Sequence, residues 1–132
     1  RYVEGSFMVG AHPDETKQDI ELTRKLIFEI DPDILMLAIM VPYPGAEVYQ
    51  LMQDEGYLDQ GIKWDHFVFF SYQPAWRTKH FSGSDLMRIH RQILRQFYLR
   101  PKYVFKTLKK LRSLGELKYW FSEGLDFINK TK

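Results

Sequence analysis

Two short loops carry the residues best placed to contact a small molecule. Residues 10–13 follow the apolar run Phe7–Gly10, and residues 41–45 follow the apolar run 34–41. Gly10 has no side chain to block a flat ligand, and the Pro-Tyr-Pro-Gly turn from Pro42 presents carbonyl groups and the ring of Tyr43. Glycine and proline also serve simply to turn a chain after a strand, and this plainer interpretation is the more frequent one.

Other candidates for chemistry are weaker. The chain has no cysteine, which excludes a disulfide, a thiolate nucleophile and a Cys-ligated metal or cluster within it. Its four histidines lack metal-ligand spacing, and the adjacent Asp65 and His66 would point to opposite faces of a strand. No Gly-rich phosphate loop or nucleophile elbow occurs. The sequence therefore predicts no catalytic residue and no metal ligand in this chain.

The first half of the sequence predicts a strand-helix-strand unit that positions these loops. Both apolar runs are hydrophobic on two faces, which is typical of strands in a parallel sheet. Between them we expect a helix from about Pro13 to Ile30, with Pro13 in its first turn, beside Asp14 and Glu15 at the positive end of the helix dipole. The helix should end at Asp31, because a proline follows. Its apolar face is predicted to comprise Ile20, Thr23, Leu26, Ile27 and Ile30.

The rest of the chain is predicted to be mainly helical. A short helix over residues 46–55 should end at Gly56, residues 66–70 suit a short strand, and residues 71–84 are expected to be irregular. A longer helix, capped by Ser84 or Asp85, would then place five apolar residues on one face: Leu86, Ile89, Ile93, Leu94 and Phe97. Pro101 should open the next helix, and a last amphipathic segment follows Gly115.

Charge divides the chain into two unlike halves. Residues 1–60 carry twelve acids and four bases, whereas residues 61–132 carry five acids and fifteen bases. Nine Lys or Arg residues and no acid lie between Leu86 and Leu114. The plainest interpretation is a solvated helix face, or one that complements the acidic half. An anionic membrane surface is the next alternative, and nucleic acid is the least favoured.

Length and composition predict one folded domain. The chain has 132 residues, 45% of them hydrophobic, and no apolar run reaches the roughly 18 residues needed to span a bilayer. These features predict a cytoplasmic protein. Arg1, rather than Met, stands only a few residues before the first predicted strand, which favours a piece of a longer polypeptide.

The order "GSFMVG…PDET", then "DPDILMLAIMVPYPGAEVY", then "GYL" and "W..F" resembles the second half of a radical S-adenosylmethionine (SAM) enzyme barrel. The resemblance covers about residues 3–70. It points to the cobalamin-binding-domain subgroup, which includes the anaerobic magnesium-protoporphyrin IX monomethyl ester oxidative cyclases. It implies an α/β fold: part (about half) of a TIM-like barrel of a few parallel strands with helices, followed by a helical C-terminal extension. The implied divisions are a barrel part over residues 1–70, a linker over 71–84 and a basic helical extension over 85–132.

The resemblance also implies site residues and cofactors. Met8 and Gly10 would lie against the adenine of SAM, Glu15 would organise the loop, and residues 40–43 would offer backbone groups to the adenine edge. These last residues are Met40, Val41, Pro42 and Tyr43. The parent enzyme would act on a small-molecule substrate with SAM and a [4Fe–4S] cluster. The subgroup leaves open whether cobalamin is a further cofactor. The three-cysteine cluster motif is absent from this chain, so it would be inactive alone.

This sequence departs from the family pattern in the first loop. Two residues, Ala11 and His12, separate Gly10 from Pro13, where the family usually has one, and Asp14 stands where glycine is usual. The partners implied are the remainder of the parent polypeptide and copies of the isolated fragment itself, since strands cut from a barrel leave open edges. The alternative is a non-enzymatic helical module that docks an acidic partner or a membrane surface through residues 88–112.

Overall fold

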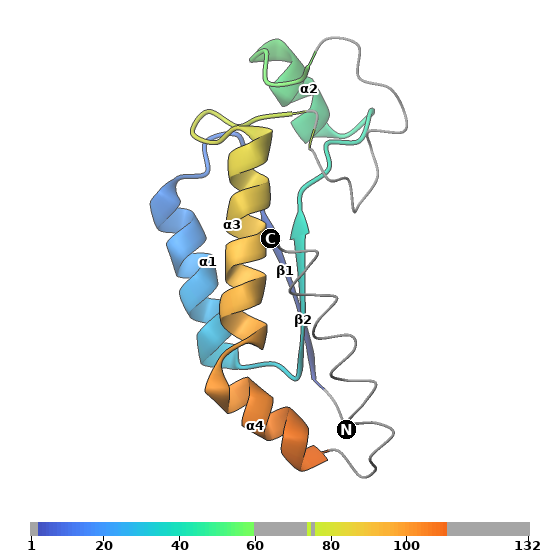
Figure 1. Ribbon diagram of the computed structural model, residues 1–132. Helices are drawn as coiled ribbons and strands as arrows, with labels where there is room; N and C mark the ends of the chain where they lie inside the picture. Colours follow the sequence, from blue (N-terminus) through green and yellow to red (C-terminus); the bar gives the residue numbers. More distant parts are fainter. Residues whose placement is uncertain (1–2, 60–73, 75, 111–132) are drawn as a thin grey trace. The chain divides into compact units, whose positions relative to one another are not determined.

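The computed structural model describes residues 3–59, 74 and 76–110. The chain divides into two compact units, residues 1–90 and 91–132, and each is described by itself below. In chain order the elements are β1 (Glu4–Val9), α1 (Lys17–Ile30), β2 (Ile34–Ile39), α2 (Glu47–Asp54), α3 (Gly83–Tyr98) and α4 (Pro101–Lys110) (Figure 1). Two parallel strands alternate with helices, which confirms the predicted α/β class.

β1 and β2 pair in parallel along their full length, from Glu4 beside Ile34 to Val9 beside Ile39. Because paired residues of parallel strands point to the same face, the register sorts the side chains into two sets. One set, which includes Val9, Leu35, Leu37 and Ile39, is mostly buried. The other set leaves Met8, Ile34 and Met36 each 43–45% exposed. The expectation of strands buried on both faces is therefore wrong for the described structure, in which one face of the sheet is open.

The start of α1 differs from the prediction. The helix begins at Lys17, and Thr16 caps it: the Thr16 hydroxyl accepts a hydrogen bond from the Asp19 N–H, and the Asp19 carboxylate accepts one from the Thr16 N–H. This capping box fixes the start four residues later than Pro13. Pro13, Asp14 and Glu15 therefore precede the helix instead of forming its first turn. The predicted end is confirmed, at Asp31, which has φ 50°.

The apolar face of α1 is only partly as predicted. Ile20 and Ile27 are buried, whereas Leu26 and Ile30 are 47% and 51% exposed. Together with Leu22, which is 56% exposed, these two form a stripe at four-residue spacing on a second side of the helix. We call Leu22, Leu26 and Ile30 the outer stripe of α1. A helix with apolar side chains on two sides is suited to lie between two neighbours.

The turns on either side of α2 are formed by the proline and glycine residues of the local sequence. Ala46 donates its N–H to the Tyr43 carbonyl, and Gly45 has φ 93°, which fits a turn with proline second and glycine third. At the other end of α2, Gly56 has φ 69° and donates to the Gln53 carbonyl, while Tyr57 donates to the Met52 carbonyl. This pair of bonds is a Schellman motif, and it confirms that the helix ends at Gly56.

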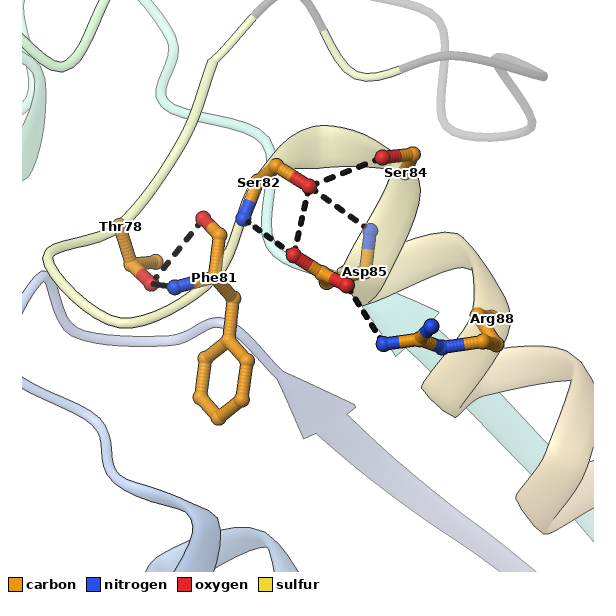
Figure 2. A network of polar contacts seen from close by, with 6 residues as sticks. All are labelled: Thr78, Phe81, Ser82, Ser84, Asp85 and Arg88. Atoms are coloured by element: carbon orange, nitrogen blue, oxygen red, sulfur yellow. Dashed lines mark hydrogen bonds and ion pairs between the residues drawn. The ribbon is translucent and has the colours of Figure 1, made fainter.

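The segment before α3 is held by local polar contacts (Figure 2). The Phe81 N–H donates to the Thr78 hydroxyl, and the buried Phe81 ring points away from these contacts (Figure 2). Ser82, and not Ser84 or Asp85, caps α3: its hydroxyl accepts from the Asp85 N–H, and the Asp85 carboxylate accepts from the Ser82 N–H. Gly83 fits only without a side chain, because an added Cβ would lie 2.5 Å from the Pro74 carbonyl oxygen.

The second unit contains the end of α3 and α4. As predicted, Pro101 opens α4, and the Tyr103 and Val104 N–H groups donate to the Arg100 carbonyl. The rings of Phe97, Tyr98 and Tyr103 contact one another with centroids 5.0–5.4 Å apart. The Arg100 guanidinium lies 4.1 Å from the centre of the Phe97 ring. These contacts fix the turn between the two helices.

Two predicted elements lie outside the described residues: the strand over residues 66–70 and the helical segment after Gly115. Over the part of the chain that the structure describes, no helix is long and apolar enough to cross a membrane. The predicted domain limits at residues 70 and 84 stay predictions.

Candidate functional site

The carboxyl ends of the two strands lie side by side. The Met40 N–H donates to the Val9 carbonyl over 3.0 Å, one step beyond the last paired residues. The structure therefore brings together the two loops that the sequence singled out, residues 10–13 and 41–45. Ligands of parallel α/β sheets gather at this end of the strands, so we take this edge as the candidate site.

Glu15 ties the first loop to the strand end. Its carboxylate accepts a hydrogen bond of 2.5 Å from the Gly10 N–H, and both residues belong to the same loop. Partial burial of the carboxylate raises the pKa of Glu15 above 4.5, and the Gly10 N–H opposes that rise. The Gly10 N–H is therefore paired within the fold and is not available to a ligand.

The missing side chain of Gly10 is explained by packing within the fold. Its φ is 67°, and an added Cβ would lie 3.2 Å and 3.3 Å from the two methyl carbons of Leu86 in α3. The glycine thus lets the β1–α1 loop and α3 approach each other. The sequence allows two interpretations of this glycine, space for a flat ligand or a simple turn after the strand, and the structure places a helix residue beside it.

The other predicted site residues point in different directions. Met8 lies on the open face of the sheet and is 45% exposed, and Tyr43 is 47% exposed. Met40 and Pro42 are buried, and Val41 is half-buried. The Met40 N–H is already bonded to Val9, so it is not available to a ligand edge. Of the predicted set, Met8 and Tyr43 therefore have the most side-chain surface to offer a ligand.

Three residues near this edge were not singled out from the sequence. The Lys79 N–H donates to the Pro13 carbonyl, and its ammonium lies 3.3 Å from the Asp14 carboxylate. Leu86 fills the space beside Gly10, and a ring nitrogen of His90 lies 2.8 Å from the Leu37 carbonyl oxygen of β2. Each contact joins segments more than fifty positions apart, so no local pattern could reveal it. Within the described residues, no group of three or more acidic or histidine side chains is arranged to hold a metal ion.

Comparison with known proteins gives one informative match. The chain is 31% identical over 104 residues to an uncharacterized methyltransferase, PH0819, of Pyrococcus horikoshii. The match covers 79% of this chain and 22% of the relative's length, so the chain spans about a fifth of the curated relative. No protein-family model matches the sequence.

This finding corrects the identification made from the two loop motifs. The similarity leads to a protein named as a methyltransferase, and neither it nor a family model supports a radical SAM oxidative cyclase. The iron–sulfur cluster and the cobalamin implied by that identification have no support either. The error has a physical cause: a strand end, a glycine turn and a Pro-Tyr-Pro-Gly turn are also required by the packing and turn geometry seen here.

Proposed function

We propose that this chain is one segment of a SAM-dependent methyltransferase, in which the loops after β1 and β2 form one wall of the methyl-donor site. The observation that carries the proposal is the 31% identity over 104 residues to an uncharacterized methyltransferase, of whose length the match covers 22%. In this reaction class a nucleophile attacks the methyl carbon of the sulfonium, the carbon–sulfur bond breaks, and the donor leaves as a thioether. No residue of this chain is assigned to that step.

The local structure supports one wall of a methyl-donor site better than it supports a complete binding pocket. Met8 and Tyr43 offer exposed apolar surface near the strand ends, as an adenosyl group would require. Glu15 and Leu86 hold the first loop in place through their contacts with Gly10. The part of the open face that bears Ile34 and Met36, and the outer stripe of α1, would both be covered by further strand-helix units of a longer polypeptide. We therefore propose that the unit is part of a larger, barrel-like α/β sheet.

Direct binding of SAM tests this proposal. Isothermal titration of a longer polypeptide that contains this chain with S-adenosylhomocysteine, the demethylated form of the donor, should give binding that Met8→Lys and Tyr43→Ala weaken. Both side chains are about half exposed, so neither change should unfold the chain. Lys25→Ala, at an exposed position of α1 outside the outer stripe, is the control. Equal affinity in all three variants, or no binding to the longer polypeptide, would remove the proposal.

A further inference from the structure

The outward side of α4 combines exposed apolar and basic side chains. Phe105 is 64% exposed, the most of any large apolar side chain in the described residues, and Leu108 is 37% exposed. Leu108 lies three positions after Phe105. The exposed Lys102 lies three positions before Phe105, and the exposed Lys109 lies four positions after Phe105. Residues at these spacings are neighbours on a helix surface. We call these four residues the α4 face.

The opposite side of α4 holds the helix in place. Tyr103 belongs to the aromatic cluster with Phe97 and Tyr98, and Val104 is half-buried. The ring contacts and the Arg100–Phe97 contact lie at the start of α4, so they fix how the helix leaves the turn. Phe105 comes two positions after Tyr103. Since each residue turns a helix by about 100°, the side chains of Phe105 and Tyr103 lie on opposite sides of α4. The α4 face is thus presented outward by the packing itself.

The charged side chains of the described part of the second unit are all basic. Residues 91–110 include seven Lys or Arg residues and no Asp or Glu. An isolated exposed phenylalanine needs no explanation, but a Phe–Leu pair between lysines, in a helix without acids, is suited to the boundary between lipid headgroups and acyl chains. Lysine stems can lie along the apolar surface while their ammonium groups reach lipid phosphates. Leu108 has no planar group to stack on a base, so this pair favours lipid over nucleic acid.

Beyond the methyltransferase proposal, and independently of it, we infer that the α4 face docks the protein on an anionic membrane surface. Phe105 and Leu108 enter the headgroup region, and Lys102 and Lys109 contact lipid phosphates or carboxylates. The occupant is the lipid surface. The acidic half of the chain and nucleic acid are the competing occupants that the experiment must separate.

Vesicle sedimentation of the full chain tests this inference. Phosphatidylcholine vesicles containing phosphatidylserine should bind the chain at low salt, and pure phosphatidylcholine vesicles should bind it far less. Phe105→Ala should weaken binding about tenfold, through lost apolar burial. Each of Lys102→Glu and Lys109→Glu should weaken it at least about fivefold, and added salt should weaken it too.

Two variants on α1 serve as matched controls. Leu22→Ala removes an apolar side chain that is 56% exposed, and Lys25→Glu reverses an exposed lysine. Both should leave vesicle binding unchanged, and circular dichroism should be the same in all variants. Lipids carrying bromine on their acyl chains should quench the added fluorescence of Phe105→Trp, which shows insertion of that position.

Several results would overturn the inference. Vesicle binding that Phe105→Ala leaves unchanged would show a purely ionic contact. Tighter binding to a single-stranded RNA than to vesicles, insensitive to Phe105→Ala, would favour nucleic acid. Absence of vesicle binding at low salt, with Phe105 protected from proteolytic or chemical probes, would indicate that the chain covers the face itself.

Discussion

At the scale of single residues, the candidate site depends on two contacts of one loop. Glu15 satisfies the N–H of Gly10, and Gly10 gives space to Leu86. Both contacts lie within the fold and hold the loop at the end of β1. Substitutions of these residues should therefore change the free energy of unfolding first. The positions with exposed surface, Met8 and Tyr43, are the ones whose substitution tests binding.

Glu15 should give the chain a specific pH dependence. Its pKa is raised in the fold from the ordinary value of 4.5, chiefly by burial, so the folded chain holds this proton to a higher pH than the unfolded chain does. The free energy of unfolding should therefore fall as pH rises from about 4.5 through the folded pKa. Glu15→Gln, whose amide oxygen can still accept from Gly10, should remove this part of the profile.

Urea titrations between acid and neutral pH measure that difference. The free energy of unfolding of the wild-type chain, relative to that of Glu15→Gln, should decrease as pH increases. A constant difference over this range would mean that the carboxyl does not titrate differently in the fold. Glu15→Ala should lose the hydrogen bond as well and be less stable than Glu15→Gln at every pH.

Two glycines with positive φ should respond differently to alanine. Gly45→Ala should cost about 1 kcal/mol, for its φ of 93° alone, because nothing lies within 4 Å of the added Cβ. Gly10→Ala carries the same backbone cost and also crowds Leu86, so we expect about 3 kcal/mol. Chemical denaturation of both variants measures this. Equal costs would mean that Leu86 yields freely to the methyl group.

At the scale of elements, polar side chains decide where α1 and α3 begin. Thr16 starts α1 and Ser82 starts α3, each paired with an aspartate three residues later. In Figure 2, Ser82 is the centre of a small network with Ser84 and Asp85, and Arg88 contacts the same aspartate. The helix start near the candidate site is therefore set by local hydrogen bonds.

Ser82→Ala should reduce the free energy of unfolding by about 1 kcal/mol, because the Asp85 N–H loses its side-chain acceptor. Ser84→Ala is the matched control, since the Ser84 hydroxyl bonds only the Ser82 hydroxyl among the contacts drawn in Figure 2. That variant should stay within about 0.5 kcal/mol of the wild type. Thermal denaturation compares the two, and equal losses would contradict the assignment of Ser82 as the cap.

At the scale of the whole molecule, apolar surface is left open on the sheet and on α1. Met8, Ile34 and Met36 are exposed on the sheet, and the outer stripe is exposed on α1. Exposed apolar surface favours association. We therefore propose that the isolated chain self-associates, through surfaces that further units of a longer polypeptide would cover.

Sedimentation velocity over a range of concentrations tests this proposal. The wild-type chain should shift toward larger species as concentration rises, and Leu22→Lys with Leu26→Lys should reduce that shift. Both side chains are about half exposed, so the double variant should keep its helical content by circular dichroism. A monomer at every concentration would show that these surfaces are tolerated in water.

The sequence determined the elements whose signals are local. Apolar runs predicted both strands, Gly56 and Pro101 marked a helix end and a helix start, and the order of elements predicted the α/β class. The start of α1 was placed too early because a proline and two acids near Pro13 outweighed the Thr16–Asp19 pair, whose reciprocal bonds the structure shows. The family identification failed for a related reason, since turn residues look alike whether they serve packing or a ligand.

Only the tertiary structure decided which faces are covered. Ile27 and Ile30 look equivalent in the sequence, yet one is buried and the other is 51% exposed, because α1 can turn only one side toward the strands. Likewise, the partner of Gly10 is Leu86, and that of His90 is the Leu37 carbonyl. Such contacts join distant segments. Their pairing depends on how helices pack on the sheet, which hydrophobic spacing along one segment cannot specify.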